Sequence, residues 1–555
     1  MSINKIKVWL DGCNKDHTYC SKSINAPFFP TRIIDVQNVQ NGTIVIREKA
    51  EVVSTNTSEA GSTASQASFP EYWTLSHRWG DPKKILQLYK GEKEGITSNE
   101  RRFRSGIALE ELSPTFRDAV QLVHRLGHRY IWIDSLCIFQ DSKSDWDREA
   151  AMMKDVYGNS FCNISAIRSS YDVSLGLFGP RIVEPQLLSP FAVDMELPVD
   201  GKLQPGKWNF WYDSLLANEM SRAPLNSRGW VVQERFLARR IIHFSRAQMY
   251  WECLEHSRCE ADPDGRLGLV GMDVRTREYK ATLRKIIEHS TPRPEDRHPA
   301  GWMYSEQGWP TPRGCWRIMV KLYSGCDLTE EDDRLIAISG VAKRFEEFYA
   351  NDKYLAGLWK QALHTDLMWE SNAFQCAPVR RGGGVAPSWS WASVRGGSVT
   401  VPAAHQKFGG EPASHIEFVD ARIKPESGGA DSTELREFSE LDIKGGLYFF
   451  KRAGTSKTFD VFADKALSKS TIQGIGSEGL RLDTEELVRK YDQEADFKGV
   501  CVLVQSASGG YGHYALSYLL VEKVSGSKYN RLGKLDGGCF GGGWDSNERT
   551  LITLI

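Results

Sequence analysis

Short apolar strands alternate with amphipathic helices between residues 72 and 165, and few folds accommodate that order. The strand-length apolar runs are YWTLS at 72–76, YIWI at 130–133 and FCNIS at 161–165. Helical patterns separate them at 113–127 and 144–158. A strand that is followed by a crossover helix rejoins the same sheet in the same direction. The sequence therefore predicts a parallel α/β sheet with right-handed crossovers.

Local signals bound both helices. Ser113 can cap the first helix, Pro114 fits its first turn, and Gly127 can end it in a left-handed conformation. Ser144 opens the second helix, with carboxylates following in its first turn. The unbroken apolar run at 130–133 is typical of a strand that is buried on both faces.

Composition excludes several classes of protein. The 70 Lys and Arg residues balance 71 Asp and Glu, so a net charge of −1 gives no electrostatic footprint for nucleic acid or an anionic membrane. No apolar run is long enough to cross a bilayer, and the start of the chain has no secretory pattern. Eleven scattered cysteines fit a reducing compartment. We expect a cytoplasmic globular protein that binds neither nucleic acid nor membrane.

The character of the sequence changes three times, which predicts four parts. Residues 1–66 form an N-terminal extension in which β-rich runs flank an Asn-Gly turn signal, as in a hairpin, before a Ser/Thr-rich linker. Residues 67–250 hold the α/β pattern. Residues 251–385 read as helical, including YLAGLWKQALHTDLMW at 354–369, and residues 386–555 read as a β-rich module.

Polar residues follow the predicted parallel strands, where ligands bind in open α/β sheets. The candidate ligand-binding residues after the first two strands are Ser76, His77, Arg78, Trp79, Asp134 and Ser135. On the next helix, Trp146 and Glu149 share a face because they are three positions apart. An indole beside a carboxylate can raise its pKa or hold a flat ring. Alternatively, Glu149 pairs with an arginine or is simply solvated.

Three further groups have both a functional and a structural interpretation. Cys13, His17 and Cys20 are metal-ligand types at close spacing, but a closed zinc site needs a fourth ligand, and free cysteines also pack well in cores. Glu234 and Arg235 are either a site or a buried strut. A second Cys/His cluster, which could complete a metal site across the fold, comprises Cys253, His256 and Cys259. Trp389 and Trp391 alternate as in a buried strand.

These residues stand in segments that strongly resemble the fungal heterokaryon incompatibility (HET) domain family. The segments are YWTLSHRWG, LSPTFRDAVQLVHRLGHRYIWIDSLCIFQD, DWDREAAMMKDVYGNSFCNISA and RGWVVQERFLARRIIHF. Flanking stretches such as PTRIIDV, LTEEDDRLIAISGVA and APSWSWAS match the usual architecture too. The resemblance implies a role in fungal non-self recognition, in which an activated HET domain triggers programmed cell death.

HET domains are also distantly similar to Toll/interleukin-1 receptor (TIR) domains, which implies a flavodoxin-like parallel sheet. Some TIR domains cleave NAD with one glutamate on a helix, and Trp146 and Glu149 fall in the corresponding place. The resemblance thus implies Glu149 as the catalytic residue and NAD as substrate, with no cofactor required. One carboxylate can suffice, because nicotinamide leaves as a neutral group and the ribose becomes oxocarbenium-like. Trp79 or Trp146 would stack on a ring and Arg78 would meet the pyrophosphate.

Two other functions remain open. The domain could be a non-enzymatic signalling adaptor, or the chain could serve a secondary-metabolite biosynthetic pathway. In the signalling roles we expect a protein partner or self-association to activate it, because the sequence has no P-loop NTPase motif and no repeat array.

Overall fold

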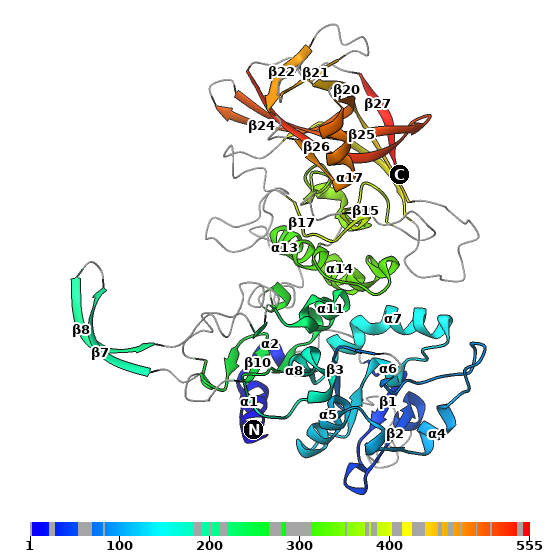
Figure 1. Cartoon of the computed structure of the whole chain (residues 1–555), viewed down its shortest axis with the longest axis vertical. Helices are drawn as coiled ribbons and strands as arrows, with labels where there is room; N and C mark the ends of the chain where they lie inside the picture. The colour runs from blue at the N-terminus through cyan, green and yellow to red at the C-terminus, as the bar shows by residue number, and fades with distance from the viewer. Residues whose placement is uncertain are drawn as a thin grey trace. The chain divides into compact units, whose positions relative to one another are not determined.

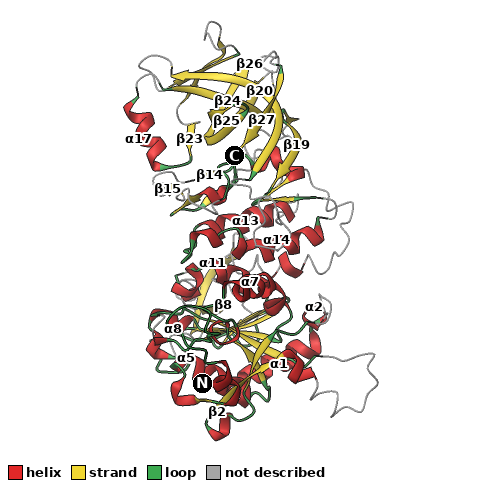
Figure 2. Ribbon diagram, turned by 90° about the vertical axis from the view of Figure 1, so that its right-hand side faces the viewer, coloured by secondary structure: helices red, strands yellow, loops and turns green. Residues whose placement is uncertain are grey.

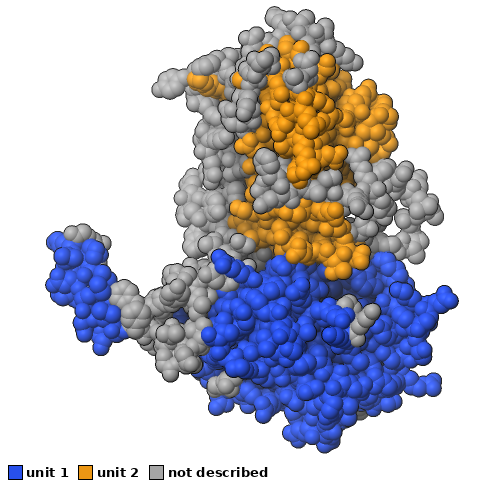
Figure 3. Space-filling model, viewed as in Figure 1, with its two compact units in different colours: residues 1–288 blue, residues 289–555 orange. Residues whose placement is uncertain are grey.

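The computed structural model divides the chain into two compact units, residues 1–288 and residues 289–555 (Figure 3). The four-part division made from the sequence stays a prediction. The structure describes residues 3–21, 28–53, 69–81, 84–182, 191–199, 202–210, 219–220, 222–265, 280, 282–284, 312–349, 352–371, 377–378, 386–401, 413–423, 439–452, 458–463, 470–476, 480–494, 497–510, 513–540 and 548–555.

Parallel strands form the middle of a nine-stranded sheet in the described part of the first unit (Figures 1 and 2). Strand β3 (Tyr72–Ser76) lies between β5 (Tyr130–Trp132) and β6 (Cys162–Ser165) and is parallel to both. Strand β9 (Arg240–Phe244) continues the parallel set beside β6. Every residue of these four strands is buried, as their apolar sequences predict.

The predicted helices connect these strands. Helix α5 (Pro114–Arg125) begins at Ser113, whose hydroxyl accepts a hydrogen bond from the Phe116 amide at 3.3 Å. Gly127 follows its end with φ +88°, as predicted. Helix α7 (Lys143–Gly158) begins one residue earlier than expected. Its cap is Ser142 and not Ser144, because the Ser142 hydroxyl accepts the Asp145 amide.

The sheet is mixed, which corrects the prediction of a parallel sheet. Strand β1 (Arg32–Asp35) pairs antiparallel with β5 and β2 (Thr43–Glu48) with β1, while β4 (Ile107–Ala108) completes that side. On the other side, β10 (Met249–Cys253) pairs antiparallel with β9, and β11 (Ser257–Cys259) pairs with β10. Short turns join β2 to β1 and add β10 and β11 after β9, as antiparallel pairing permits, whereas β1 pairs with β5 across a long stretch of chain.

The hairpin predicted near residues 31–48 is confirmed, and it belongs to this sheet. Its turn is longer than an Asn-Gly pair, because a 3₁₀ turn (Val39–Asn41) precedes Gly42, which has φ +78°. The remaining elements of the first unit are α1 (Ile3–Asp16), α2 (Thr18–Ser21), α4 (Glu100–Ser105), α6 (Asp134–Cys137), α8 (Ile167–Tyr171), α11 (Gly229–Leu237) and a separate hairpin of β7 (Phe191–Val199) and β8 (Lys202–Phe210).

One predicted helix of the second unit is present, and a hairpin replaces the start of another. Helix α14 (Ile336–Phe348) matches the helical pattern at 333–350, whereas helix α13 (Pro312–Ser324) was not predicted individually. Most of the helix predicted at 279–290 lies outside the described residues. Strands β12 (Tyr354–Leu355) and β13 (Leu358–Trp359) occupy the start of the segment 354–369 that was predicted as a helix. The hairpin forms instead of a helix because Gly357 adopts a turn conformation with φ +101°. Its carbonyl accepts hydrogen bonds from the indoles of Trp316 and Trp391.

The β-rich C-terminal part is confirmed as a ten-stranded sheet within the described residues. Strand β20 pairs with β27 as far as Gly446 and with β24 from Leu447 onward. Strand β20 can change partners there because Gly445 has no side chain and lets Val502 approach closely. A Cβ at this position would lie 2.9 Å from the Val502 side chain. The strands are β18 (Ala413–Ser414), β19 (Glu417–Arg422), β20 (Glu440–Arg452), β21 (Thr458–Phe462), β22 (Ser470–Gly476), β23 (Leu480–Leu482), β24 (Lys498–Gly510), β25 (His513–Ser525), β26 (Lys528–Phe540) and β27 (Arg549–Leu554).

Trp389 and Trp391 are fully buried as predicted, but they do not lie on a strand. Trp391 begins a 3₁₀ turn (Trp391–Ser393) that the Ser390 hydroxyl caps. Short pieces complete this unit: a helical turn α15 (Leu363–Asp366), strands β14 (Glu370–Ser371), β15 (Ala377–Pro378), β16 (Val394–Arg395) and β17 (Val399–Thr400), and helix α17 (Glu485–Gln493). None of the described helices has the length and apolar character that crossing a membrane requires.

A buried arginine joins the β-rich part of the second unit to the segment before it. Arg531 on β26 binds both carboxylate oxygens of Asp483, at 2.8 and 3.0 Å, and donates to the carbonyls of Leu367 and Trp369. Its guanidinium also stacks on the Trp369 ring at 3.6 Å.

We expect Arg531→Leu to lower the free energy of unfolding of this unit by about 3–5 kcal/mol, because it leaves the Asp483 carboxylate buried without its partner. Denaturant titration of the full chain measures this. The control is Arg489→Leu, which removes an exposed ion pair on α17 and should cost no more than about 0.5 kcal/mol. Equal effects of the two substitutions would contradict the prediction.

Candidate functional site

A chain of buried hydrogen bonds crosses the carboxyl ends of β3 and β6. The Thr74 hydroxyl donates to Asn163 Oδ1, and Asn163 Nδ2 donates to Ser76 Oγ, both at 2.9 Å. Because Ser76 accepts at its oxygen, its own proton is free to go onward, and it hydrogen-bonds the carboxylate of Glu234. At the carboxyl ends of β3 and β6, the Ser76 hydroxyl therefore points its proton toward the carboxylate of Glu234 on α11.

Glu234 is a fully buried carboxyl group. Burial raises its pKa to about 7, against the opposing effects of the Ser76 hydrogen bond and the charge of Arg228, while the charge of Asp134 raises it further. Tyr157 also hydrogen-bonds this carboxylate. Among the described residues, no donor reaches its Oε2 atom. This group is poised to exchange a proton near neutral pH.

Asp134, directly after β5, presents its carboxylate beside two residues that follow β3. The Trp79 indole donates to Asp134 Oδ2 at 2.8 Å, and the Ser135 amide donates to Oδ1 at 2.7 Å. His77 Nε2 lies 3.7 Å from Oδ1, and burial lowers the pKa of this histidine, so its imidazole is neutral at physiological pH. The Asp134 side chain is 22% exposed. The carboxylate is thus fixed in place and still reachable.

The other predicted ligand-binding residues differ in accessibility. Arg78 is exposed and donates to the Ser170 carbonyl at 3.4 Å. Ser135 is fully buried, so its side chain cannot contact a ligand in this conformation. Trp146 packs edge-on against Trp230, with ring centroids 6.1 Å apart, and Lys143 lies over its ring.

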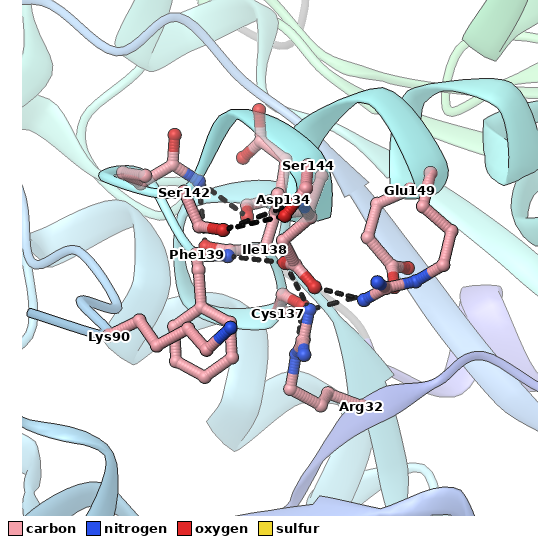
Figure 4. A network of polar contacts seen from close by, with 12 residues as sticks. Arg32, Lys90, Asp134, Cys137, Ile138, Phe139, Ser142, Ser144 and Glu149 are labelled. Carbon is pink, nitrogen blue, oxygen red and sulfur yellow. Dashed lines mark hydrogen bonds and ion pairs between the residues drawn. The ribbon is translucent and has the colours of Figure 1, made fainter. Parts of the chain in front are cut away.

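Glu149 lies in a separate network of charges at the carboxyl end of β5 (Figure 4). Its carboxylate is 3.2 Å from Arg148 and 3.6 Å from Arg32, and the residue is only 1% exposed. Both arginines also bind Asp145, and Arg32 donates to the Cys137 carbonyl at 2.8 Å. Burial raises the pKa of Glu149 while the charge of Arg32 opposes the shift. The arginine pairing that the sequence left open as an alternative is present.

Glu234 and Arg235 lie in different networks. Arg235 Nε is 3.1 Å from Glu252 Oε2, and His243 Nε2 is 2.9 Å from the same oxygen. Burial would raise the pKa of Glu252, but the charge of Arg235 and the His243 hydrogen bond lower it to about 2. Arg235 therefore ties α11 to β10, while Glu234 faces the edge of the sheet.

The two predicted Cys/His clusters are rearranged into one group. Cys13, His17 and Cys20 meet Cys253, and the four candidate ligand atoms lie within 4.8 Å of one another, all buried. The ring of His256 packs against that of His17 at a tilt, with centroids 4.6 Å apart. Cys259 packs elsewhere, in an apolar cluster that includes Tyr250 and Ile167.

Some residues of these networks were not singled out from the sequence. Asn163 could have been found, because a polar side chain inside a buried strand needs a partner. Arg228 and Arg32 gave no such signal, since surface arginines are common and their partners lie far away in the sequence.

Comparison with protein families matches residues 72–234 to the family described as heterokaryon incompatibility protein (HET). This stretch of the chain is therefore a HET domain, as the resemblance of its motifs implied. Ser76, Asp134, Glu149 and Glu234 lie inside the matched region, whereas the Cys/His group lies outside it. Searches of curated proteins and of solved structures gave no match.

The raised pKa of Glu234 predicts a pH-dependent effect on stability. Between its unfolded value of 4.5 and its folded value of about 7, the folded state binds more protons, so stability falls as pH rises through this interval. Glu234→Gln removes that loss. Relative to the wild type, we expect the variant to be more stable at pH 8 than at pH 5 by roughly 3 kcal/mol.

Denaturant unfolding of the full chain at the two pH values measures this difference. Glu110→Gln, which removes an exposed carboxylate in the same unit, serves as the control and should show no such change. A pH-independent effect of Glu234→Gln would mean that its carboxyl group titrates normally.

Proposed function

We propose that this chain acts in fungal non-self recognition of the heterokaryon-incompatibility type, and that its HET domain signals cell death by cleaving NAD in the cytoplasm. The match of residues 72–234 to the HET family carries the proposal. Activation comes from a protein partner or from self-association, since the sequence has no P-loop NTPase motif that could act as a built-in switch.

The strand order supports a ligand at the edge described above. The parallel strands lie in the order β5, β3, β6, β9, which is second, first, third and fourth along the chain. Flavodoxin-like sheets share this order and bind ligands at the carboxyl ends of the strands where it reverses. In this chain that position is between β3 and β6, where Ser76 ends its strand.

Cleavage of the nicotinamide–ribose bond needs a carboxylate close to the developing positive charge. Nicotinamide takes the electron pair of the broken bond and leaves as a neutral molecule, and water then adds to the ribose. Asp134 suits the contact with ribose, because it is held by Trp79 and the Ser135 amide and is partly exposed. In this proposal Arg78 meets the pyrophosphate, and the proton of the attacking water passes to solvent.

A non-enzymatic adaptor is the second candidate, and the burial of Glu149 favours it. The sequence-based assignment places catalysis on Glu149, yet its carboxylate is paired with Arg32 and Arg148 and would have to leave both to contact a substrate. In an adaptor this network stabilises the domain and presents its surface to a partner.

The test is NAD content and viability after induced expression of the full chain in yeast, with protein levels recorded. With the wild type we expect NAD to fall before viability does. Asp134→Asn should slow NAD loss by about 100-fold, because it removes the charge that stabilises the ribose cation. Asp147→Asn removes a carboxylate on α7 that pairs with Lys143, and this control should act as the wild type does.

Glu149→Gln tests which of the two carboxylates, Asp134 or Glu149, is catalytic. If it abolishes NAD loss at normal protein level while Asp134→Asn does not, Glu149 is the catalytic residue as the sequence implied. Cell death with NAD intact would refute cleavage and support the adaptor.

A further inference from the structure

The Cys/His group joins the N-terminal helices to the sheet. Cys13 lies in the last turn of α1, His17 follows one turn later, and Cys20 lies on α2, so the three side chains share one face of the segment. Cys253 ends β10, 236 positions after His17 in the sequence. The fold therefore brings a fourth ligand to a group that is incomplete in the local sequence.

The distances within the group fit one tetrahedral ion. His17 Nδ1 is 3.4 Å from Cys253 Sγ and 3.8 Å from Cys20 Sγ. Around a zinc ion with Zn–S near 2.3 Å and Zn–N near 2.0 Å, tetrahedral geometry places nitrogen and sulfur about 3.6 Å apart and two sulfurs about 3.8 Å apart. The four ligand atoms, all within 4.8 Å of one another, need to move little to reach these values.

Surrounding groups stabilise charge on the sulfurs. Arg240 Nε donates to Cys13 Sγ at 3.2 Å, and the His256 amide donates to Cys253 Sγ at 3.3 Å. The Cys253 amide in turn donates to the His256 carbonyl, so a tight turn wraps the sulfur. Three thiolates around Zn²⁺ carry a net charge of −1, which the buried guanidinium of Arg240 balances. Such outer hydrogen bonds are typical of metal sites.

We propose that Cys13, His17, Cys20 and Cys253 bind one structural zinc ion that fastens α1 and α2 to strand β10. Four protein ligands leave no open position for water or substrate, so the ion holds the fold and takes no part in the chemistry of the HET domain. Three thiolates and one imidazole are a ligand set that suits zinc. On binding, the three thiols release their protons to solvent.

Helix α1 also packs on strand β10, so the proposed ion would add a second contact between this helix and the sheet. Trp9 lies against Trp251 of β10, with ring centroids 6.4 Å apart, and its indole donates to the Pro263 carbonyl at 3.1 Å. The zinc ion would fix the C-terminal end of α1 to the strand whose middle contacts Trp9. The N-terminal segment would then be held to the sheet at two points.

The experiment uses the full chain, purified with reductant and without chelator. Elemental analysis should find one zinc per chain. After growth with cobalt in place of zinc, we expect the visible absorption of tetrahedral Co²⁺ and a near-ultraviolet thiolate-to-cobalt band. Cys20→Ser and Cys253→Ser should each reduce the bound zinc several-fold. Cys259→Ser changes a buried thiol six positions from Cys253 but outside the ligand set, and it should keep the ion.

Each outcome decides the proposal. A wild-type chain that contains no zinc and shows no tetrahedral cobalt spectrum overturns it, as does a disulfide between two of the three cysteines in the reduced cytoplasm. Loss of zinc from Cys259→Ser to the same extent as from Cys253→Ser also overturns it. If the ligand variants do not fold, the wild-type cobalt spectrum and the metal content still give the answer.

Discussion

A charged group that is removed from water needs a partner, and in this protein several buried arginines find theirs in distant segments of the chain. Arg32 binds carboxylates of α7 more than 100 positions away. Arg235 links α11 to Glu252 on β10, and in the second unit Arg531 links β26 to Asp483 and to Trp369. Each of these pairs would be costly to break. Together they connect elements that are far apart in the sequence.

Some elements can be predicted from their own residues alone. Strand β3 and helix α5 follow directly from an apolar run and from the residues Ser113, Pro114 and Gly127. Partner choice is different. The pairing of β1 with β5 depends on residues far apart, so the mixed sheet could not be read from either strand. The segment 354–369, which begins with the hairpin, has leucines and tryptophans at helical spacing, and only the contacts of Gly357 with two indoles reveal the turn.

The candidate site shows the same division between local and distant causes. Ser76 and Asp134 follow the parallel strands β3 and β5 in the same direction, so their place at the carboxyl ends of these strands follows from the direction of the sheet, and their role as site residues stays a prediction. Burial of Glu149 could not be foreseen, because it depends on Arg32 from a segment before the HET match. The sequence offered Cys253, His256 and Cys259 as residues that could complete a metal site with Cys13, His17 and Cys20. That Cys253 alone of these three joins the group depends on the fold.

In the first unit, the segment that matches the HET family does not have the same boundaries as the folded sheet. The HET match begins at the first residue of β3 and ends within α11. Strand β1, which pairs with β5, precedes the match, and β9, which pairs with β6, follows it. A fragment cut at these limits would carry two uncovered strand edges, each able to pair with another chain. The matched segment is thus smaller than the sheet to which it belongs, and the flanking segments supply the strands that pair with its outer strands.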